Sequence, residues 1–245
     1  CSGVTGAVLQ NAALPNGMVM ISPSATSPGL TSMDDDGLFF RTAPSDARQG
    51  EVMADVLMEE GIKQVAVTYT NNDYGKGLVD QGGSGLVRAA IDSGAFDTFH
   101  FPDGMIAANL ENNFGTELDG STGQHPGTDS PGADKFTALV DGAFDTTSPF
   151  APESYDATAL LMLAMQAAGS TDPQVYKDQI MSVANAPGEK IYPGELGKAL
   201  QILKDGGKVD YDGATAVELI GPGESAGSYR QIKIEGGKIT TVQYL

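Results

Sequence analysis

Cysteine and histidine are scarce in this sequence, and tryptophan is absent. The 245 residues contain one cysteine, Cys1, and two histidines, His100 and His125. A thiol that binds metal or takes part in catalysis usually needs companion ligands, and no second cysteine exists. Neither histidine lies in a metal-binding spacing such as His-Glu-x-x-His. We therefore expect Cys1 to be either a buried thiol or half of a disulfide whose partner lies outside this chain.

Positive charge is also in short supply. Lys and Arg number 14 against 32 Asp and Glu, which gives a formal net charge of −18. Nucleic acids and anionic membrane surfaces are bound through Lys and Arg, so this balance argues against both as partners. The simplest interpretation of the acidity is a soluble protein kept apart from its neighbours by like charge. Recruitment of a cationic partner stays open.

Long hydrophobic runs are missing. No apolar run approaches the roughly 20 residues that span a bilayer. The chain opens on Cys-Ser-Gly-Val, without the basic, apolar and small-residue series of a signal peptide, so we expect that a signal was removed or that the true N-terminus lies upstream. With 40% hydrophobic and 19% charged residues, the composition is that of a globular protein with one large or two small domains.

Catalytic motifs are not found either. Gly82-Gly83-Ser84-Gly85 is not a Gly-x-Ser-x-Gly elbow, because residue 86 is Leu. Gly221-Pro222-Gly223 matches no phosphate-binding or dinucleotide motif, since no helix is expected after it. Asp34-Asp35-Asp36-Gly37 lacks the later ligands of a calcium loop. A carboxylate pair stays open, but nothing singles one out. We therefore expect a protein that is not an enzyme.

What is present is an alternation of helix-period and strand-type segments. Helical periodicity marks residues 4–12, 52–57, 86–91, 136–140, 155–168 and 196–203. Short apolar runs typical of buried parallel strands lie at residues 18–21, 64–69 and 98–101. Residues 229–235 and 238–244 alternate around Gly236-Gly237 and predict a β-hairpin. The pattern predicts an α/β fold, with parallel strands covered by helices on both faces.

One stretch is too short for this alternation. A helix is expected from Asp73, and another follows Gly85 with no room for the strand that should separate them. A βαβ unit needs on the order of 30 residues. We therefore expect a helix and a strand to be missing near Leu78–Val79. Residues left out between these two positions are the favoured explanation, although a natural deletion would give the same spacing.

Five blocks of the sequence resemble the leucine/isoleucine/valine-binding proteins, in the order in which that family carries them. The blocks are residues 18–31, 40–46, 72–77, 102–105 and 154–157, and the terminal hairpin fits as well. The resemblance covers essentially the whole chain, and the ordered set is specific although each block alone is weak. It implies a type I periplasmic-binding fold, with two Rossmann-like parallel-sheet lobes joined by hinge crossovers.

The resemblance also implies a division into lobes. Residues 1–42 and 124–230 would form lobe 1, and residues 43–123 and 231–245 would form lobe 2. Compared with the family, the chain starts late and would lack the first βαβ units of lobe 1, as well as a helix–strand unit of lobe 2 near Leu78. Family members often pair a cysteine at the position of Cys1 with one upstream, and this chain has no such partner.

The resemblance further implies an amino-acid ligand. A ligand carboxylate needs neutral donors, and an ammonium group needs an acidic acceptor. The family pattern places the carboxylate against Ser2, Ser24, Ala25 and Thr26. Plainer roles stay open for these residues, because Ser and Thr in a proline-rich loop most often serve turns and caps.

The family pattern places the ammonium against Asp103. Tyr74 would close over the ligand from lobe 2, and Tyr155 and Asp156 would lie near the cleft. Here too plainer roles stay open, since an Asp before Gly is by default a turn residue and a Tyr on an apolar helix more often belongs to the core.

The function implied is that of a periplasmic solute-binding protein. It would capture an amino acid, of branched-chain type or an analogue, by lobe closure and deliver it as a monomer to a membrane ABC permease, with no cofactor. The alternative is a ligand-sensing domain of the same fold in a receptor or regulator. A sensor would be fused to a signalling segment, whereas this chain ends on its terminal strand at Leu245, which favours a free carrier. The sequence leaves open which amino acid or analogue is bound.

Overall fold

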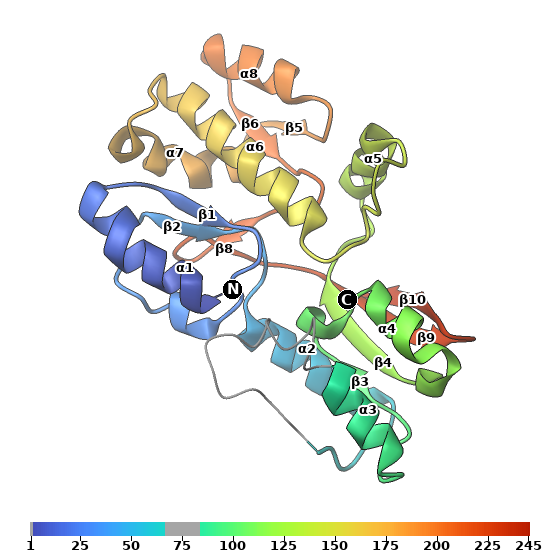
Figure 1. Ribbon diagram of the computed structural model, residues 1–245. Helices are drawn as coiled ribbons and strands as arrows, with labels where there is room; N and C mark the ends of the chain where they lie inside the picture. The colour runs from blue at the N-terminus through green and yellow to red at the C-terminus, as the bar shows by residue number, and fades with distance from the viewer. Residues whose placement is uncertain (1, 67–83) are drawn as a thin grey trace.

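The computed structural model describes residues 2–66 and 84–245, and its elements fall into two groups (Figure 1). The helical group consists of α1, β1, β2 and the elements from α5 to β8. The sheet group consists of α2, α3, α4 and the strands β3, β4, β9 and β10. The chain passes between the two groups at three places: between β2 and α2, between β4 and α5, and between β8 and β9.

The N-terminal part of the helical group is a helix followed by a parallel strand pair. Helix α1 (Ser2–Val8) continues as a π-helical turn (Leu9–Ala13) and a 3₁₀ turn (Leu14–Asn16), and Gly17 ends it in the left-handed conformation. Strand β1 (Met20–Ser22) pairs in parallel with β2 (Phe39–Arg41). The loop between them carries a 3₁₀ turn (Pro28–Leu30).

The larger part of the helical group is built around one buried helix. Its elements are α5 (Pro131–Val140), α6 (Ala151–Ala168), α7 (Pro173–Ala184), β5 (Glu189–Ile191), α8 (Leu196–Lys204), β6 (Val209–Tyr211), β7 (Leu219–Ile220) and β8 (Glu224–Ser225). Helix α6 is apolar nearly all round, and its Leu160 and Leu163 are fully buried against residues such as Ile180, Ile191 and Tyr211. This burial supplies most of the apolar contact that stabilises the group.

The sheet group surrounds a four-stranded sheet in the order β10-β9-β4-β3. Its elements are α2 (Asp46–Glu59), α3 (Ser84–Asp92), β3 (His100–Phe101), α4 (Ala108–Phe114), β4 (Thr122–Pro126), β9 (Tyr229–Glu235) and β10 (Lys238–Tyr244), with 3₁₀ turns at Asp103–Met105 and Gly115–Leu118. Strands β3 and β4 are parallel, whereas β9 is antiparallel to both of its neighbours. The core of the sheet group contains Phe101, Leu110 and Ile232.

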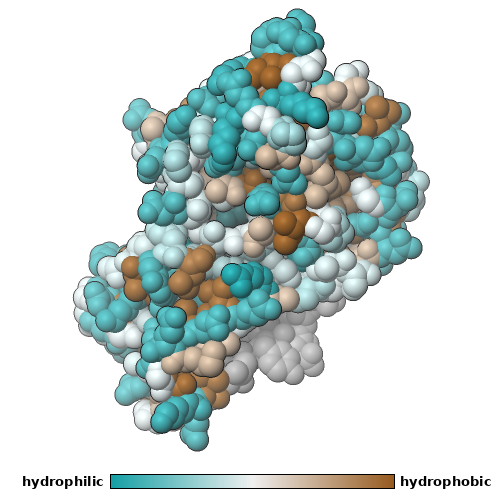
Figure 2. Space-filling model, turned by 180° about the vertical axis from the view of Figure 1, so that it is seen from behind, coloured by the Kyte–Doolittle hydropathy of each residue, from teal (hydrophilic) through white to brown (hydrophobic). Residues whose placement is uncertain are grey.

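Most of the predicted elements are confirmed. All six helical periods lie in helices, and the terminal hairpin is present as β9 and β10. Ser45 caps α2, since its hydroxyl oxygen accepts the N–H of Ala47 at 3.3 Å. Seen from behind, the surface is mainly hydrophilic with scattered small hydrophobic areas, in line with the globular composition (Figure 2).

One expectation needs correction, and others fall outside the described residues or stay predictions. The predicted strand at residues 64–69 is wrong for residues 64–66, which are exposed and pair with no strand; residues 67–69 lie outside the described part. A buried strand needs neighbouring strands that form hydrogen bonds with it. Residues 64–66 pair with no strand of the described chain. Tyr74 and the step from Leu78 to Val79 also lie outside the described residues, and the predicted lobe boundaries stay a prediction.

Candidate ligand-binding site

The loop after β1 is held in place by side chains of both parallel strands. The buried hydroxyl of Ser22 accepts the N–H of Ala25 at 3.0 Å and that of Ser24 at 3.4 Å. The fully buried guanidinium of Arg41 donates to the carbonyl oxygens of Ala25 at 3.1 Å and Ser27 at 3.0 Å. The loop is therefore fixed from both ends. A ligand carboxylate that used the N–H groups of Ser24 and Ala25 would have to replace Ser22 as their acceptor.

Two further elements meet this loop. The hydroxyl oxygen of Ser2, in the first turn of α1, accepts the N–H of Ser27 at 3.1 Å. The carbonyl oxygen of Thr26 accepts the N–H of Asp46, the first residue of α2, at 2.8 Å. The structure thus brings together four residues that the family pattern assigned to the carboxylate: Ser2, Ser24, Ala25 and Thr26.

Arg41 is anchored by an ion pair on its other side. Its guanidinium lies 2.5 Å from the carboxylate of Glu224 on β8 and donates to the hydroxyl of Thr31 at 2.9 Å. Glu224 also accepts a short hydrogen bond from Thr31. Because Arg41 is bonded to Glu224, Thr31 and the loop carbonyls, its charge stabilises the conformation of the loop.

The first turn of α6 lies against the end of β2. The hydroxyl of Thr42, one residue beyond β2, donates to the carbonyl oxygen of Glu153 at 2.8 Å. The side chain of Glu153 is buried, with 2% of the residue exposed. Its Oε2 atom has no hydrogen-bond partner in the described part of the chain. Burial, with smaller contributions from Asp156 and Asp103, raises the pKa of Glu153 to about 8, so the group is mostly neutral at pH 7.

Sequence reasoning missed Glu153. It directly precedes the block 154–157, but a Glu in the first turn of a helix is ordinarily an exposed residue that favours the helix dipole. Only the position of α6 against β2 buries it, and no signal in the local pattern indicates that contact.

Asp103 lies in the 3₁₀ turn that follows β3 in the sheet group, and it is half-buried. Its charge raises the pKa of Glu153 and also that of Tyr229, where burial is the largest cause. The hydroxyl of Tyr229 in turn donates to the carbonyl oxygen of Ser45 at 3.3 Å, beside the start of α2. The charge of Asp103 therefore acts on a residue in the first turn of α6 and on Tyr229, whose hydroxyl is bonded to the residue that caps α2.

The two other candidates on α6 make contacts inside the helical group. The carboxylate of Asp156 accepts four hydrogen bonds of 2.7–2.8 Å, from the hydroxyl of Tyr211, the N–H of Ala214, and the N–H and hydroxyl of Thr215. Burial raises its pKa to about 6, so it is ionised at pH 7. These four donors occupy both oxygens of Asp156.

Tyr155 contacts α5 and the turn before α8. Its ring lies 5.2 Å from that of Phe136, centroid to centroid, and its hydroxyl oxygen accepts the N–H of Gly194 at 3.3 Å. The structure does not place Tyr155 against the loop after β1. Its assignment to the ligand stays a prediction, and so does that of Tyr74, which lies outside the described residues.

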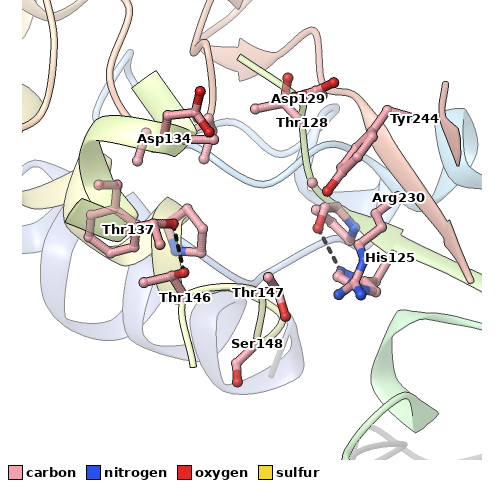
Figure 3. A pocket seen from close by; sticks show the side chains of 17 residues that line it. His125, Thr128, Asp129, Asp134, Thr137, Thr146, Thr147, Ser148, Arg230 and Tyr244 are labelled. Carbon is pink, nitrogen blue, oxygen red and sulfur yellow. Dashed lines mark hydrogen bonds between the residues drawn. The ribbon is translucent and has the colours of Figure 1, made fainter. Parts of the chain in front are cut away.

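A cavity of about 240 Å³ lies beside the crossover from β4 to α5 (Figure 3). Polar side chains from both groups surround it, among them Thr128, Asp134, Thr147, Arg230 and Tyr244. His125 also lines it, and burial lowers the pKa of this histidine to about 4. Within the described part of the chain, none of the residues that the family pattern assigns to the ligand lines this cavity.

Residues 2–66 and 84–245 contain no group of three or more His, Cys, Asp and Glu side chains arranged to hold a metal ion. None of the helices in the same residues combines the length and apolarity that crossing a membrane requires.

Comparison with known proteins gives partial sequence matches. The family described as receptor family ligand binding region matches residues 1–84. The chemotactic signal transduction system substrate-binding protein BasB of Halobacterium salinarum is 27% identical over 260 residues, which cover 87% of this chain and 63% of that protein. Leu/Ile/Val-binding protein homolog 3 of Brucella melitensis is 39% identical over 106 residues, covering 40% of this chain and 27% of that protein. The chain thus spans less than two thirds of the length of either relative.

The architecture is shared with solved structures of branched-chain amino-acid-binding proteins. The branched-chain amino acid transporter substrate-binding protein LivJ of Streptococcus pneumoniae, solved with isoleucine, has a TM-score of 0.70. The match covers 100% of this chain and 77% of that one at 16% sequence identity, which shows the fold. The chain has the α/β type I periplasmic-binding fold, and part of its sequence is similar to Leu/Ile/Val-binding proteins.

Proposed function

We propose that this protein is the solute-binding component of an ABC importer and binds an α-amino acid, of branched-chain type or an analogue, between its two groups of elements. The observation that carries the proposal is the position of Asp103. It comes from the sheet group, yet its charge acts on Glu153 in the first turn of α6, which belongs to the helical group. An acidic residue at such a junction suits the ammonium of a bridging ligand.

The carboxylate end of the ligand would bind the loop after β1. Ser24, Ala25 and Thr26 lie on this loop, and the hydroxyl of Ser2 is joined to it through Ser27. The loop contributes hydroxyl donors and N–H donors that the ligand would take over from Ser22, and it is rigid because Arg41 holds two of its carbonyl oxygens. A rigid set of donors limits the entropy that is lost when the ligand binds.

The relatives are described as binding proteins, and the proposed function is likewise binding and not catalysis. The proposed cycle is therefore reversible capture. A ligand that contacts both groups favours the closed arrangement by its difference in affinity for the two states. The closed form would then dock on a membrane permease at the periplasmic side, with the protein acting as a monomer.

A second candidate function is ligand sensing. The relative in Halobacterium salinarum carries the description of a chemotactic signal transduction substrate-binding protein. In that role the closed protein would dock on a transducer in place of a permease. Both candidates share the amino-acid site, and pull-down with ligand-loaded protein against a permease and a transducer distinguishes them.

Isothermal titration calorimetry with a panel of amino acids tests the proposal. We expect binding of L-leucine, L-isoleucine or L-valine at a ratio of one per chain, with the ligand recovered unchanged. Failure of every α-amino acid to bind, or the formation of a product, contradicts it. Tyrosine fluorescence is the second readout, since the chain contains no tryptophan.

A further inference from the structure

We infer that Glu153 is a second acidic contact for the ligand's ammonium group, opposite Asp103, and that it releases its proton to solvent when the ammonium binds. The inference rests on the proposed function and names a residue to which neither the family pattern nor the comparisons give a role.

The carboxyl group of Glu153 is buried and has an oxygen without a hydrogen-bond partner. Glu153 is 2% exposed, and its Oε2 atom has no hydrogen-bond partner in residues 2–66 and 84–245. A buried polar atom without a partner is unfavourable and is rarely kept in a folded protein without a reason. The backbone around it is well bonded, since Thr42 donates to its carbonyl oxygen at 2.8 Å. The carboxyl group itself has backbone hydrogen bonds with Glu153 and Phe150, so the vacant hydrogen-bonding capacity belongs to its Oε2 atom.

The charged groups around Glu153 are negative. The charged groups that act on Glu153 are Asp156, on the same helix, and Asp103, in the turn after β3. Both are acidic, and both raise its pKa. From β2 the neighbour is Thr42, which is neutral, while the charge of Arg41 is engaged by Glu224 and by loop carbonyls. A cation brought by the ligand is the missing partner of this cluster.

Asp156 is not the group that needs this cation. Its two carboxylate oxygens accept four hydrogen bonds from Tyr211, Ala214 and Thr215. Glu153 has backbone hydrogen bonds with its own residue and with Phe150, but its Oε2 atom accepts none from the described residues. Of the two carboxyl groups on α6, Glu153 is therefore the one left for a ligand, and Asp103 approaches it from the other group of elements.

The protonation change follows from this arrangement. With its pKa raised to about 8, Glu153 is mostly protonated at pH 7 in the free protein. An ammonium group next to Glu153 favours the ionised form of this residue, so binding moves the proton from Glu153 to the buffer. Below pH 8 the dissociation constant for an ammonium-bearing ligand should then fall by about tenfold for each unit of rising pH.

The experiment is calorimetry of L-leucine binding in phosphate and in Tris at pH 7, two buffers of different ionisation enthalpy. We expect the observed enthalpies to differ by the amount due to release of nearly one proton. Glu153→Gln keeps the shape of the neutral acid, and it should abolish both the proton release and the pH dependence while weakening binding about tenfold or more. 4-Methylpentanoate is leucine without its ammonium group, and it should bind weakly and release no proton.

The outcomes separate this inference from the proposed function. If L-leucine and the other amino acids do not bind, the proposed function fails, and the inference fails with it. If L-leucine binds without proton release, or binds Glu153→Gln with the wild-type pH dependence, the inference is overturned and the proposed function stands. Binding of 4-methylpentanoate with the affinity of leucine would mean that the protonated Glu153 donates to a carboxylate, and it also overturns the inference. The wild-type measurement in two buffers decides even if the variant does not fold.

Discussion

The hydroxyl of Thr42 and the carbonyl oxygen of Glu153 form a hydrogen bond of 2.8 Å between residues 111 positions apart in the chain. This bond fixes the first turn of α6 to the end of β2, the strand whose Arg41 holds the loop after β1. The two proposed ends of the ligand site are therefore joined by a short and rigid connection.

Replacement of Thr42 by Val tests this connection. Loss of a buried hydrogen bond of this kind costs about 1 kcal/mol of unfolding free energy. We also expect weaker leucine binding, because the first turn of α6 loses its contact with β2. Urea unfolding and calorimetry measure the two effects. Thr158→Val is the matched control, since Thr158 lies exposed on the same helix and donates to the carbonyl oxygen of Ser154 at 3.0 Å.

Unchanged stability and affinity in Thr42→Val would contradict this account of the junction. A loss of equal size in Thr158→Val would indicate a general effect of valine in place of threonine, and not the contact with β2.

The carboxylate of Asp156 provides a prediction about stability alone. In Asp156→Asn an NH₂ group replaces one of the two oxygens that accept hydrogen bonds from Tyr211, Ala214 and Thr215. At least one buried N–H then loses its acceptor, which costs about 1–3 kcal/mol for each group. Thermal unfolding should show a clear drop in Tm.

The control for Asp156 is Asp172→Asn. Asp172 caps α7 by accepting the N–H of Gln174 at 3.0 Å, and Asn is an equally good residue at that position. Its Tm should stay near the wild-type value. A Tm for Asp156→Asn equal to that of this control would show that the four hydrogen bonds contribute little.

The raised pKa of Glu153 predicts how stability depends on pH. The group has a pKa of about 8 in the folded chain against an ordinary value of 4.5, so the folded state binds more protons. Its stabilising contribution is complete below pH 4.5 and is lost as the pH rises to 8, by about 1.4 kcal/mol per pH unit. Glu153→Gln does not titrate and should remove this part of the slope.

Urea unfolding at pH 5, 6.5 and 8 measures the slope. The difference in unfolding free energy between Glu153→Gln and the wild type should grow in favour of the variant as the pH rises. Glu59→Gln, at the exposed end of α2, is the control and should leave the slope unchanged. Parallel curves for Glu153→Gln and the wild type would show that Glu153 is not a buried neutral acid.

Much of the fold could be predicted because helices and hairpins produce patterns of apolar and turn residues in the local sequence. The apolar residues of α6 recur all round the helix, and Gly236-Gly237 separates two alternating strands, so helix and hairpin were both found. Strands of two or three residues, such as β5 and β7, are too short to show any period. Residues 64–66 have the composition of a strand, but strand formation depends on a neighbour that local sequence does not specify.

The site could be predicted only in part, for a related reason. Ser24, Ala25, Thr26 and Asp103 lie in blocks that resemble a known family, and their neighbourhood follows from that resemblance. Glu153 takes its environment from α6 lying against β2, a contact between residues far apart in sequence. The hydrogen bonds from Ser22 to the loop N–H groups are likewise a tertiary feature, set by the path of the chain after β1.

The most direct test of the central claim is calorimetric titration of L-leucine into the wild-type protein, Asp103→Ala and Asp35→Ala. Loss of a buried charge-assisted contact weakens binding by about tenfold or more, so Asp103→Ala should bind L-leucine at least about tenfold more weakly than the wild type does. Asp35 accepts the N–H of Gly37 at 2.9 Å in a separate turn, so Asp35→Ala should bind like the wild type. Wild-type affinity in Asp103→Ala would contradict the assignment of Asp103 to the ligand's ammonium and, with it, the proposed site.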